Sequence, residues 1–176
     1  MKSSVITFPG SNCDRDIDVA LKKFGFKNKM VWHDDAELPK SDLVVLPGGF
    51  SYGDYLRSGS IANYSPIMEK VVEHSNKGGY VMGICNGFQI LCESGLLPGA
   101  LLHNTNHKFI CKNIHLKPIS KNTLVTNQYS DEAIKIPIAH GEGRFYADEN
   151  TLKKLVENDQ ILFKYSDENG NITKES

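Results

Sequence analysis

The sequence is poor in cysteine and carries almost no excess charge. Its 176 residues include four cysteines, at positions 13, 85, 92 and 111, and no two of them form a C-x-x-C pair. This spacing argues against a structural zinc site and against a disulfide framework. Twenty Lys and Arg stand against 21 Asp and Glu, so the chain has no basic stripe for a phosphate backbone. We therefore expect neither a metal site nor a nucleic-acid partner.

Long apolar runs are also lacking. No stretch is long enough to span a bilayer, and the apolar part of the N-terminal MKSSVITFPG is too short for a secretory signal. We therefore expect a cytoplasmic protein with no membrane partner. The content of 40% hydrophobic and 23% charged residues is typical of a globular chain, and 176 residues are enough for one well-buried domain.

Short apolar runs alternate with helical spacing through the first hundred residues. The predicted strands contain no polar alternation, which favours a mostly parallel, doubly wound, flavodoxin-like α/β sheet with helices on both faces. Ligands of such sheets bind at the carboxyl ends of the strands, where the loops after Phe8, Leu46 and Ile84 converge. The predicted strands are Val5–Phe8, Lys29–His33, Asp42–Leu46 and Gly79–Ile84, and the predicted helices are Asp14–Phe24, Pro66 to near Gly78, and Asn86–Glu93.

The pattern changes after Gly99, where short apolar runs and polar turns predict a small β-rich addition to the core sheet. No change in composition marks a boundary, so we predict a single domain over residues 1–176. We expect residues Asp167–Ser176 to form a polar loop. The predicted strands are Leu101–Leu102, Phe109–Leu116, Leu124–Tyr129, Ile134–Ala139 and Ile161–Tyr165, with one helix at Thr151–Val156.

Cys85 lies between a predicted strand and a predicted helix, in the order Gly83-x-Cys85-x-Gly87. This is the arrangement of a nucleophile elbow with cysteine in place of serine. The sharp turn strains the backbone at the nucleophile and crowds the positions two residues away, where glycine fits. The helix N-terminus favours the thiolate, and the amide of Asn86 points to where an oxyanion would form.

The alternative for Cys85 is an inert thiol buried at the end of a strand, which is the common case for cysteine. Cys92 lies two helical turns further on and Cys111 lies in an apolar strand, so we expect both in the core. The loop Leu46–Asp54 (LPGGFSYGD) is glycine-rich, and a phosphate cradle is its rival interpretation. The chain contains neither G-x-G-x-x-G nor G-K-[ST], so we favour an oxyanion loop facing Cys85.

The motifs GICNGFQ and PGGFSYGDYLRSG together resemble those of the class I (triad) glutamine amidotransferases. PGGFSYGDYLRSG and FPGSNCDRD narrow the resemblance to the glutaminase subunits of phosphoribosylformylglycinamidine synthase, an enzyme of purine synthesis, and GLLPGALLHN and AHGEGRF are further matches. The likeness covers essentially all 176 residues. It implies the class I amidotransferase fold, with the small β-rich addition belonging to that fold.

This resemblance implies a reaction and a set of site residues. Cys85 would attack the side-chain amide of glutamine, forming a glutamyl thioester and releasing ammonia. The amides of Gly49, Phe50 and Asn86 match the oxyanion hole of the family, and Gln89 matches a residue that helps bind glutamine. The ammonia would pass to a separate synthetase subunit that uses ATP and Mg²⁺, in a complex with a third small protein. This chain itself would need no cofactor.

The family takes its base and orienting acid from a His-x-Glu pair in a Pro-His-Pro-Glu stretch, which this sequence does not contain. We therefore expect a chain that lacks the C-terminal segment of the family fold. Such a chain would be a poor glutaminase, or a degenerate form that serves as a docking subunit. His140, in AHGEGRF, also precedes an x-Glu, but it matches a separate element of the family. It is the weaker candidate for the base.

A further class shares the cysteine elbow and the doubly wound core, and its members act as chaperones, deglycases or peptidases. These proteins place a carboxylate from the first strand region beside the cysteine. The corresponding loop here, Pro9–Asn12, has no acid before Asp14, which disfavours this alternative.

Overall fold

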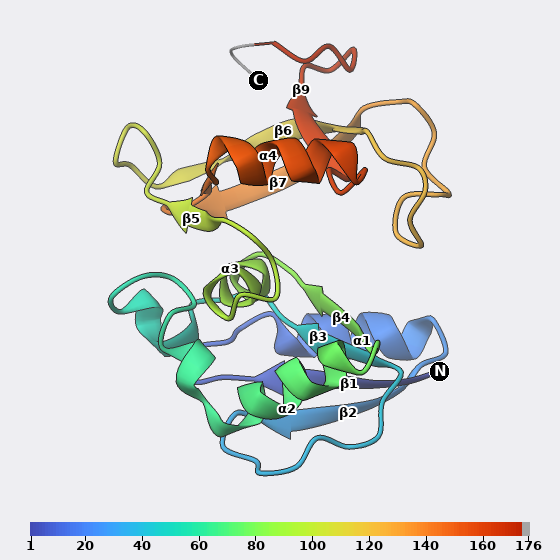
Figure 1. The fold of residues 1–176 in the computed structure, drawn as a ribbon, viewed down its shortest axis with the longest axis vertical. Helices are drawn as coiled ribbons and strands as arrows, with labels where there is room; N and C mark the ends of the chain where they lie inside the picture. Colours follow the sequence, from blue (N-terminus) through green and yellow to red (C-terminus); the bar gives the residue numbers. More distant parts are fainter. Residues whose placement is uncertain (174–176) are drawn as a thin grey trace. The chain divides into compact units, whose positions relative to one another are not determined.

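The computed structural model describes residues 1–173 (Figure 1). By their contacts the residues divide into two compact units, Met1–Leu101 and Leu102–Ser176. The prediction of one domain over residues 1–176 stays a prediction, because compactness alone does not show whether a unit folds independently.

A four-stranded parallel sheet forms the centre of the first unit. Its spatial order, β2-β1-β3-β4, reverses the direction of winding between β1 and β3. In open parallel sheets, ligands bind beside such a reversal, at the carboxyl ends of the strands. The loops after β1 and β3 therefore flank the expected site. The strands are β1 (Lys2–Thr7), β2 (Lys27–Trp32), β3 (Leu43–Leu46) and β4 (Tyr80–Gly83).

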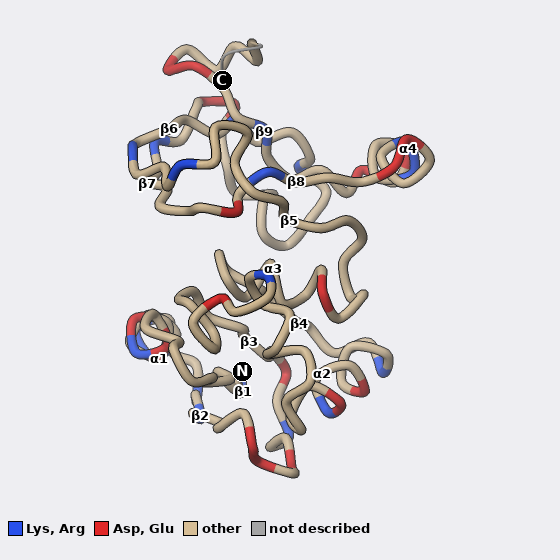
Figure 2. The backbone as a smooth tube through the Cα atoms, turned by 90° about the vertical axis from the view of Figure 1, so that its left-hand side faces the viewer, with Lys and Arg blue, Asp and Glu red and all other residues tan. Residues whose placement is uncertain are grey.

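Three α-helices accompany this sheet: α1 (Asp14–Lys23), α2 (Pro66–Asn76) and α3 (Asn86–Glu93). Helix α1 packs on β1 and β2, whereas α2 packs on β4 and α3 packs on β3 and β4. Right-handed crossovers that run in opposite directions place their helices on opposite faces of a sheet. Figure 2 shows α1 and α2 on the two sides of the strands. The predicted doubly wound, mostly parallel α/β fold is therefore confirmed.

The core of the first unit lies between the sheet and its helices. Strands buried on both faces explain why the sequence shows continuous apolar runs there. Cys92, on α3, is buried as expected. No helix within residues 1–173 is both long and apolar enough to cross a membrane. The fully buried core side chains include Val5, Ile6 and Phe8 near β1, Val44 and Leu46 on β3, Ile67 and Val71 on α2, and Ile90 on α3.

The second unit is rich in β structure, as predicted. Strand β6 (Ile110–Pro118) pairs antiparallel with β7 (Ile134–His140) and with β9 (Phe163–Ser166). Helix α4 (Glu149–Glu157) begins after Asp148, whose carboxylate accepts a hydrogen bond from the amide of Thr151 and caps the helix. The short strands β5 (Ala100–Leu102) and β8 (Arg144–Tyr146) complete the elements, and the sequence pattern missed β8.

Two expectations for the second unit are wrong. The segment predicted as a strand at Leu124–Tyr129 forms turns, because the Thr123 hydroxyl accepts from the Thr126 amide at 3.2 Å and local bonds replace a ladder. Cys111, expected in the core, is exposed. It shares the solvent face of β6 with Asn113, since an antiparallel sheet can leave one face to water. Residues 174–176 of the predicted C-terminal loop lie outside the described residues.

A close contact between α3 and β3 is testable by mutation. A methyl group at Gly87 would overlap the carbonyl oxygen of Leu46. We expect Gly87→Ala to lower the free energy of unfolding by about 2–3 kcal/mol, because α3 would have to move away from β3. Urea denaturation measures this loss.

Gly25→Ala is the control, because a methyl group there meets no atom within 4 Å and only the φ of +79° is unfavourable. Its expected cost is about 1 kcal/mol. Equal losses of stability in the two variants would show that position 87 requires glycine for its backbone conformation and not for the approach of α3 to β3.

Candidate active site

Cys85 occupies the turn between β4 and α3 with a backbone that few residues other than glycine adopt. Its dihedral angles are φ 53° and ψ −110°, and its side chain is exposed. The crowding predicted for an elbow is present, because a Cβ at Gly83 would lie 2.5 Å from the Gly87 carbonyl oxygen. The strain at Cys85 persists because β4 and α3 hold the turn from both ends.

The N-terminus of α3 offers an unused amide beside this sulfur. The carbonyl of Cys85 accepts hydrogen bonds from the amides of Phe88 and Gln89, at 3.0 and 3.2 Å, which closes the first turn of the helix. Within residues 1–173 the amide of Asn86 has no hydrogen-bond partner. A free amide at a helix N-terminus stabilises negative charge, on a thiolate or on an oxyanion.

The loop after β3 approaches the same turn. A Cβ built at Gly48 would lie 3.4 Å from the Cβ of Cys85, so this loop passes directly beside the nucleophile candidate. The amide of Phe50 donates to the carbonyl of Gly10 at 3.0 Å, whereas the amide of Gly49 has no partner within the described residues. Of the amides predicted for an oxyanion hole, those of Gly49 and Asn86 are therefore available.

Cys13 also lies beside Gly48, which the sequence did not indicate. The Cβ position at Gly48 is 3.5 Å from the Cys13 sulfur, and the Cys13 amide donates to the Gly48 carbonyl at 3.3 Å. Burial, then the charges of Asp16 and of the Cys85 thiolate, raise the pKa of the Cys13 thiol. Cys13 thus favours the protonated form, unlike a sulfur prepared for nucleophilic attack.

Gln89 lies one turn along α3 from the elbow. Its Oε1 accepts a hydrogen bond of 3.0 Å from the side-chain amide of Asn86, which is itself almost completely buried. Gln89 therefore lies in the same hydrogen-bonded group as the elbow. The role of Gln89 in binding glutamine stays a prediction.

His140 belongs to the second unit. Its Nδ1 donates to Oδ1 of Asn104 at 2.9 Å, and Asn104 also accepts from the amide of Gly143. Nε2 is buried with no partner within residues 1–173. The histidine is thus held as part of the loop structure after β7. Its use as a base stays a prediction.

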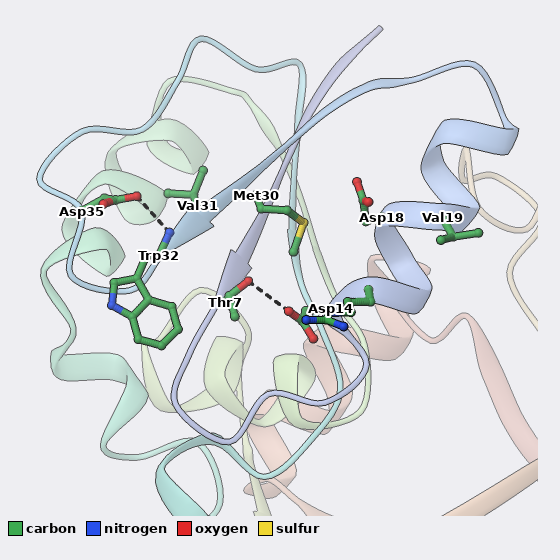
Figure 3. Close-up of a pocket in the computed structure, with 9 residues that line it drawn as sticks. Thr7, Asp14, Asp18, Val19, Met30, Val31, Trp32 and Asp35 are labelled. Atoms are coloured by element: carbon green, nitrogen blue, oxygen red, sulfur yellow. Dashed lines mark hydrogen bonds between the residues drawn. The ribbon is translucent and has the colours of Figure 1, made fainter.

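A separate cavity of about 590 Å³ lies between α1 and β2 (Figure 3). Asp35 accepts a hydrogen bond of 2.9 Å from the amide of Trp32 at one end, and Asp14 lies within 3.4 Å of the Thr7 hydroxyl at the other. None of the described residues that line this cavity was predicted as a site residue. The cavity and the predicted site at the elbow therefore share no residue.

The strain at Cys85 leads to a first prediction for the site. We expect Cys85→Gly to be more stable than Cys85→Ala by about 1 kcal/mol, because glycine adopts a positive φ without strain. The same pair at Cys111, in the extended strand β6, should reverse the order, since glycine weakens a regular strand. Equal stability of the two Cys85 variants in urea would contradict a strained elbow.

Thiol alkylation provides a second prediction. Burial, with the charge of Glu93, raises the pKa of Cys92 to about 11, so this thiol is both covered and protonated at pH 8. We expect iodoacetamide at pH 8 to modify Cys85 and to leave Cys92 unmodified in the folded protein, as read by peptide mass spectrometry. In urea, Cys92 should react. Rapid alkylation of Cys92 in the folded chain would contradict this assignment.

Comparison with known proteins places these features in a family. The model of the CobB/CobQ-like glutamine amidotransferase domain matches residues 1–176. The phosphoribosylformylglycinamidine synthase subunit PurQ of Pelagibacter ubique is 61% identical over 176 residues, which are 100% of this chain and 78% of that protein. The subunit PurQ of Campylobacter jejuni is 55% identical over 166 residues, which are 94% of this chain and 74% of that protein.

Solved structures agree with these sequence matches. The structure of PurLQS from Thermotoga maritima superimposes with a TM-score of 0.82 at 44% identity, over 97% of this chain and 77% of that chain. A glutamine amidotransferase from the same organism has a TM-score of 0.56 at 18% identity, over 92% of this chain and 84% of that chain, and shares the fold alone. The chain therefore belongs to the CobB/CobQ-like glutamine amidotransferase family and, within it, to the PurQ subunits of phosphoribosylformylglycinamidine synthase.

Proposed function

We propose that Cys85 is the nucleophile with which this glutamine amidotransferase subunit hydrolyses glutamine. The observation that carries the proposal is the position of Cys85, an exposed thiol on a positive-φ turn at the N-terminus of α3. The thiolate attacks the side-chain amide carbon of glutamine, a C–S bond forms, and the carbonyl oxygen takes up the negative charge. Collapse of this intermediate breaks the C–N bond, the nitrogen takes a proton from water and leaves as ammonia, and the glutamyl thioester that remains is cleaved by water to glutamate and free thiol.

The oxyanion is stabilised in this proposal by two backbone amides, those of Gly49 and Asn86. Both lack an internal partner, and they come from the two segments that flank the sulfur. Phe50, which the resemblance also implicated, contributes by the bond from its amide to Gly10, which holds the loop in place. Donors that are fixed before the reaction lose no free energy to reorganisation when charge develops.

The proton balance of the reaction requires a base that accepts the thiol proton and an acid that protonates the leaving ammonia. Nε2 of His140 is buried without a partner among residues 1–173. We therefore assign no proton-transfer step to His140.

Gln89 is the residue that we propose to hold the substrate glutamine.

The ammonia leaves this subunit for a synthetase in our proposal. The solved relative is a PurLQS structure, which supports assembly of this chain with a large synthetase subunit and a third small subunit. ATP and Mg²⁺ act on the synthetase side, while the hydrolysis at Cys85 uses only side chains, backbone amides and water. The cytoplasmic location expected from the sequence stays a prediction.

The test uses the complete subunit assembled with its synthetase partners. We expect Cys85→Ala to lower the rate of glutamine-dependent synthesis at least about 1,000-fold, since the covalent step is lost. Supplied ammonium should still support synthesis, because the defect lies only in the production of ammonia. Glutamine added to the parent enzyme and quenched with acid should give a glutamyl adduct on the peptide that contains Cys85.

Cys111→Ala is the matched control, because it removes an exposed thiol from a strand of the second unit. It should leave both activities unchanged. Glutamine-dependent synthesis that persists in Cys85→Ala would overturn the proposed role of Cys85.

A further inference from the structure

The side chain of Asn86 connects the two segments that form the proposed oxyanion site. Asn86 is 1% exposed, and its Oδ1 accepts a hydrogen bond of 3.1 Å from the amide of Ser51 in the loop after β3. Its Nδ2 donates to Oε1 of Gln89 at 3.0 Å and lies 3.4 Å from Oδ1 of Asp54. One buried carboxamide therefore contacts the loop at two points and α3 at a third.

The contact with Ser51 has no local substitute. Ser51 is 2% exposed, and its hydroxyl is already buried without a partner within the described residues. If the carboxamide of Asn86 were lost, the Ser51 amide would become a second unsatisfied polar group at the same place. Because an unpaired buried donor is costly, the loop would have to shift to reach another acceptor or water.

The backbone of the loop after β3 is strained. Tyr52, Asp54 and Leu56 all have positive φ, between 52° and 68°, although none of them is glycine. Such conformations persist only where surrounding contacts impose them. On one side the loop is fastened to the segment after β1, where the Tyr52 amide donates to the Pro9 carbonyl at 2.6 Å. On the side of α3, Asn86 holds it through Ser51 and Asp54.

We infer that the Asn86 side chain is a positioning residue for glutamine hydrolysis. It holds the Ser51 amide, and through this it fixes where the Gly49 amide lies relative to the sulfur of Cys85. The sequence assigned Asn86 a role through its backbone amide only. In this inference the side chain of Asn86 has a second role, which is to set the distance between the amides of Gly49 and Asn86. This inference rests on the proposed role of Cys85.

Asn86→Leu tests the inference in the complete subunit assembled with its synthetase partners. Leucine has the same branching at Cγ, although it is larger, and it cannot accept from the Ser51 amide. We expect kcat for glutamine hydrolysis to fall about 100-fold while KM changes by less than about threefold, because a displaced oxyanion donor acts on the transition state. Alkylation of Cys85 by iodoacetamide forms no oxyanion, so its rate should stay within about twofold.

Exchanging the carboxylate and the carboxamide between positions 54 and 86 tests whether the lost kcat can be restored. Asn86→Asp keeps an acceptor for the Ser51 amide but places a second carboxylate against Asp54 and removes the donor, so we expect kcat to fall because the two charges push the loop away from α3. In the double variant Asn86→Asp with Asp54→Asn, the carboxylate at 86 accepts from both the Ser51 amide and the new amide at 54. We expect the double variant to recover at least about tenfold in kcat over Asn86→Asp, the non-additivity that signals direct coupling.

Asn28→Leu is the matched control. Asn28 lies on β2 and its side chain also bridges two elements, because it accepts from the hydroxyl of Ser3 and donates to Asp18. Its loss should lower the free energy of unfolding without changing kcat.

Two results would overturn the inference. The first is an unchanged kcat in Asn86→Leu, and the second is an equal loss of kcat and of the iodoacetamide rate, which would indicate a collapsed elbow. Failure of the double variant to exceed Asn86→Asp would exclude the link through Asp54. The proposed role of Cys85 is tested separately, because glutaminase activity that persists in Cys85→Ala would contradict it.

Discussion

The close approach of α3 to the end of β3 is the constraint on which the rest of the site depends. The Leu46 carbonyl accepts a hydrogen bond from the amide of Ile84 at 3.0 Å, and the backbone of Gly87 lies against the same oxygen. No side chain fits between them. With β4 and α3 both held to β3, the residue between them has to turn sharply, and Cys85 takes the positive φ that results.

This constraint also brings two separate loops to the sulfur. Since β3 ends beside the elbow, the loop that follows it starts next to Cys85, where a Cβ at Gly48 would lie 3.4 Å from the Cβ of Cys85. The reversal of winding between β1 and β3 adds the loop after β1, whose Gly10 carbonyl binds the Phe50 amide. The buried carboxamide of Asn86 then joins the loop to α3. A small displacement of α3 would therefore disturb the contacts that Asn86 makes with the loop.

Local patterns predicted much of the first unit because local forces determine it there. The apolar strands, the glycine spacing around Cys85 and the start of α3 each follow from requirements that neighbouring residues impose on one another. The second unit was harder to predict. Leu124 and Val125 resemble strand residues, but the hydroxyls of Thr123 and Thr126 form turns there. Short, half-exposed segments leave such choices to contacts that no pattern records.

By itself, the sequence determined the elbow, its nucleophile candidate and the family to which the chain belongs, because these depend on residue types at fixed short spacings. Only the tertiary structure decided which amides are available. The amide of Phe50 is bonded to Gly10, some forty residues away in the chain, whereas those of Gly49 and Asn86 are unpaired within residues 1–173. It also decided that Cys13 lies beside Gly48 and that Asn86 holds Ser51. Hydrogen bonds between distant segments leave no periodic signal, since they depend on how the strands and loops come together in space.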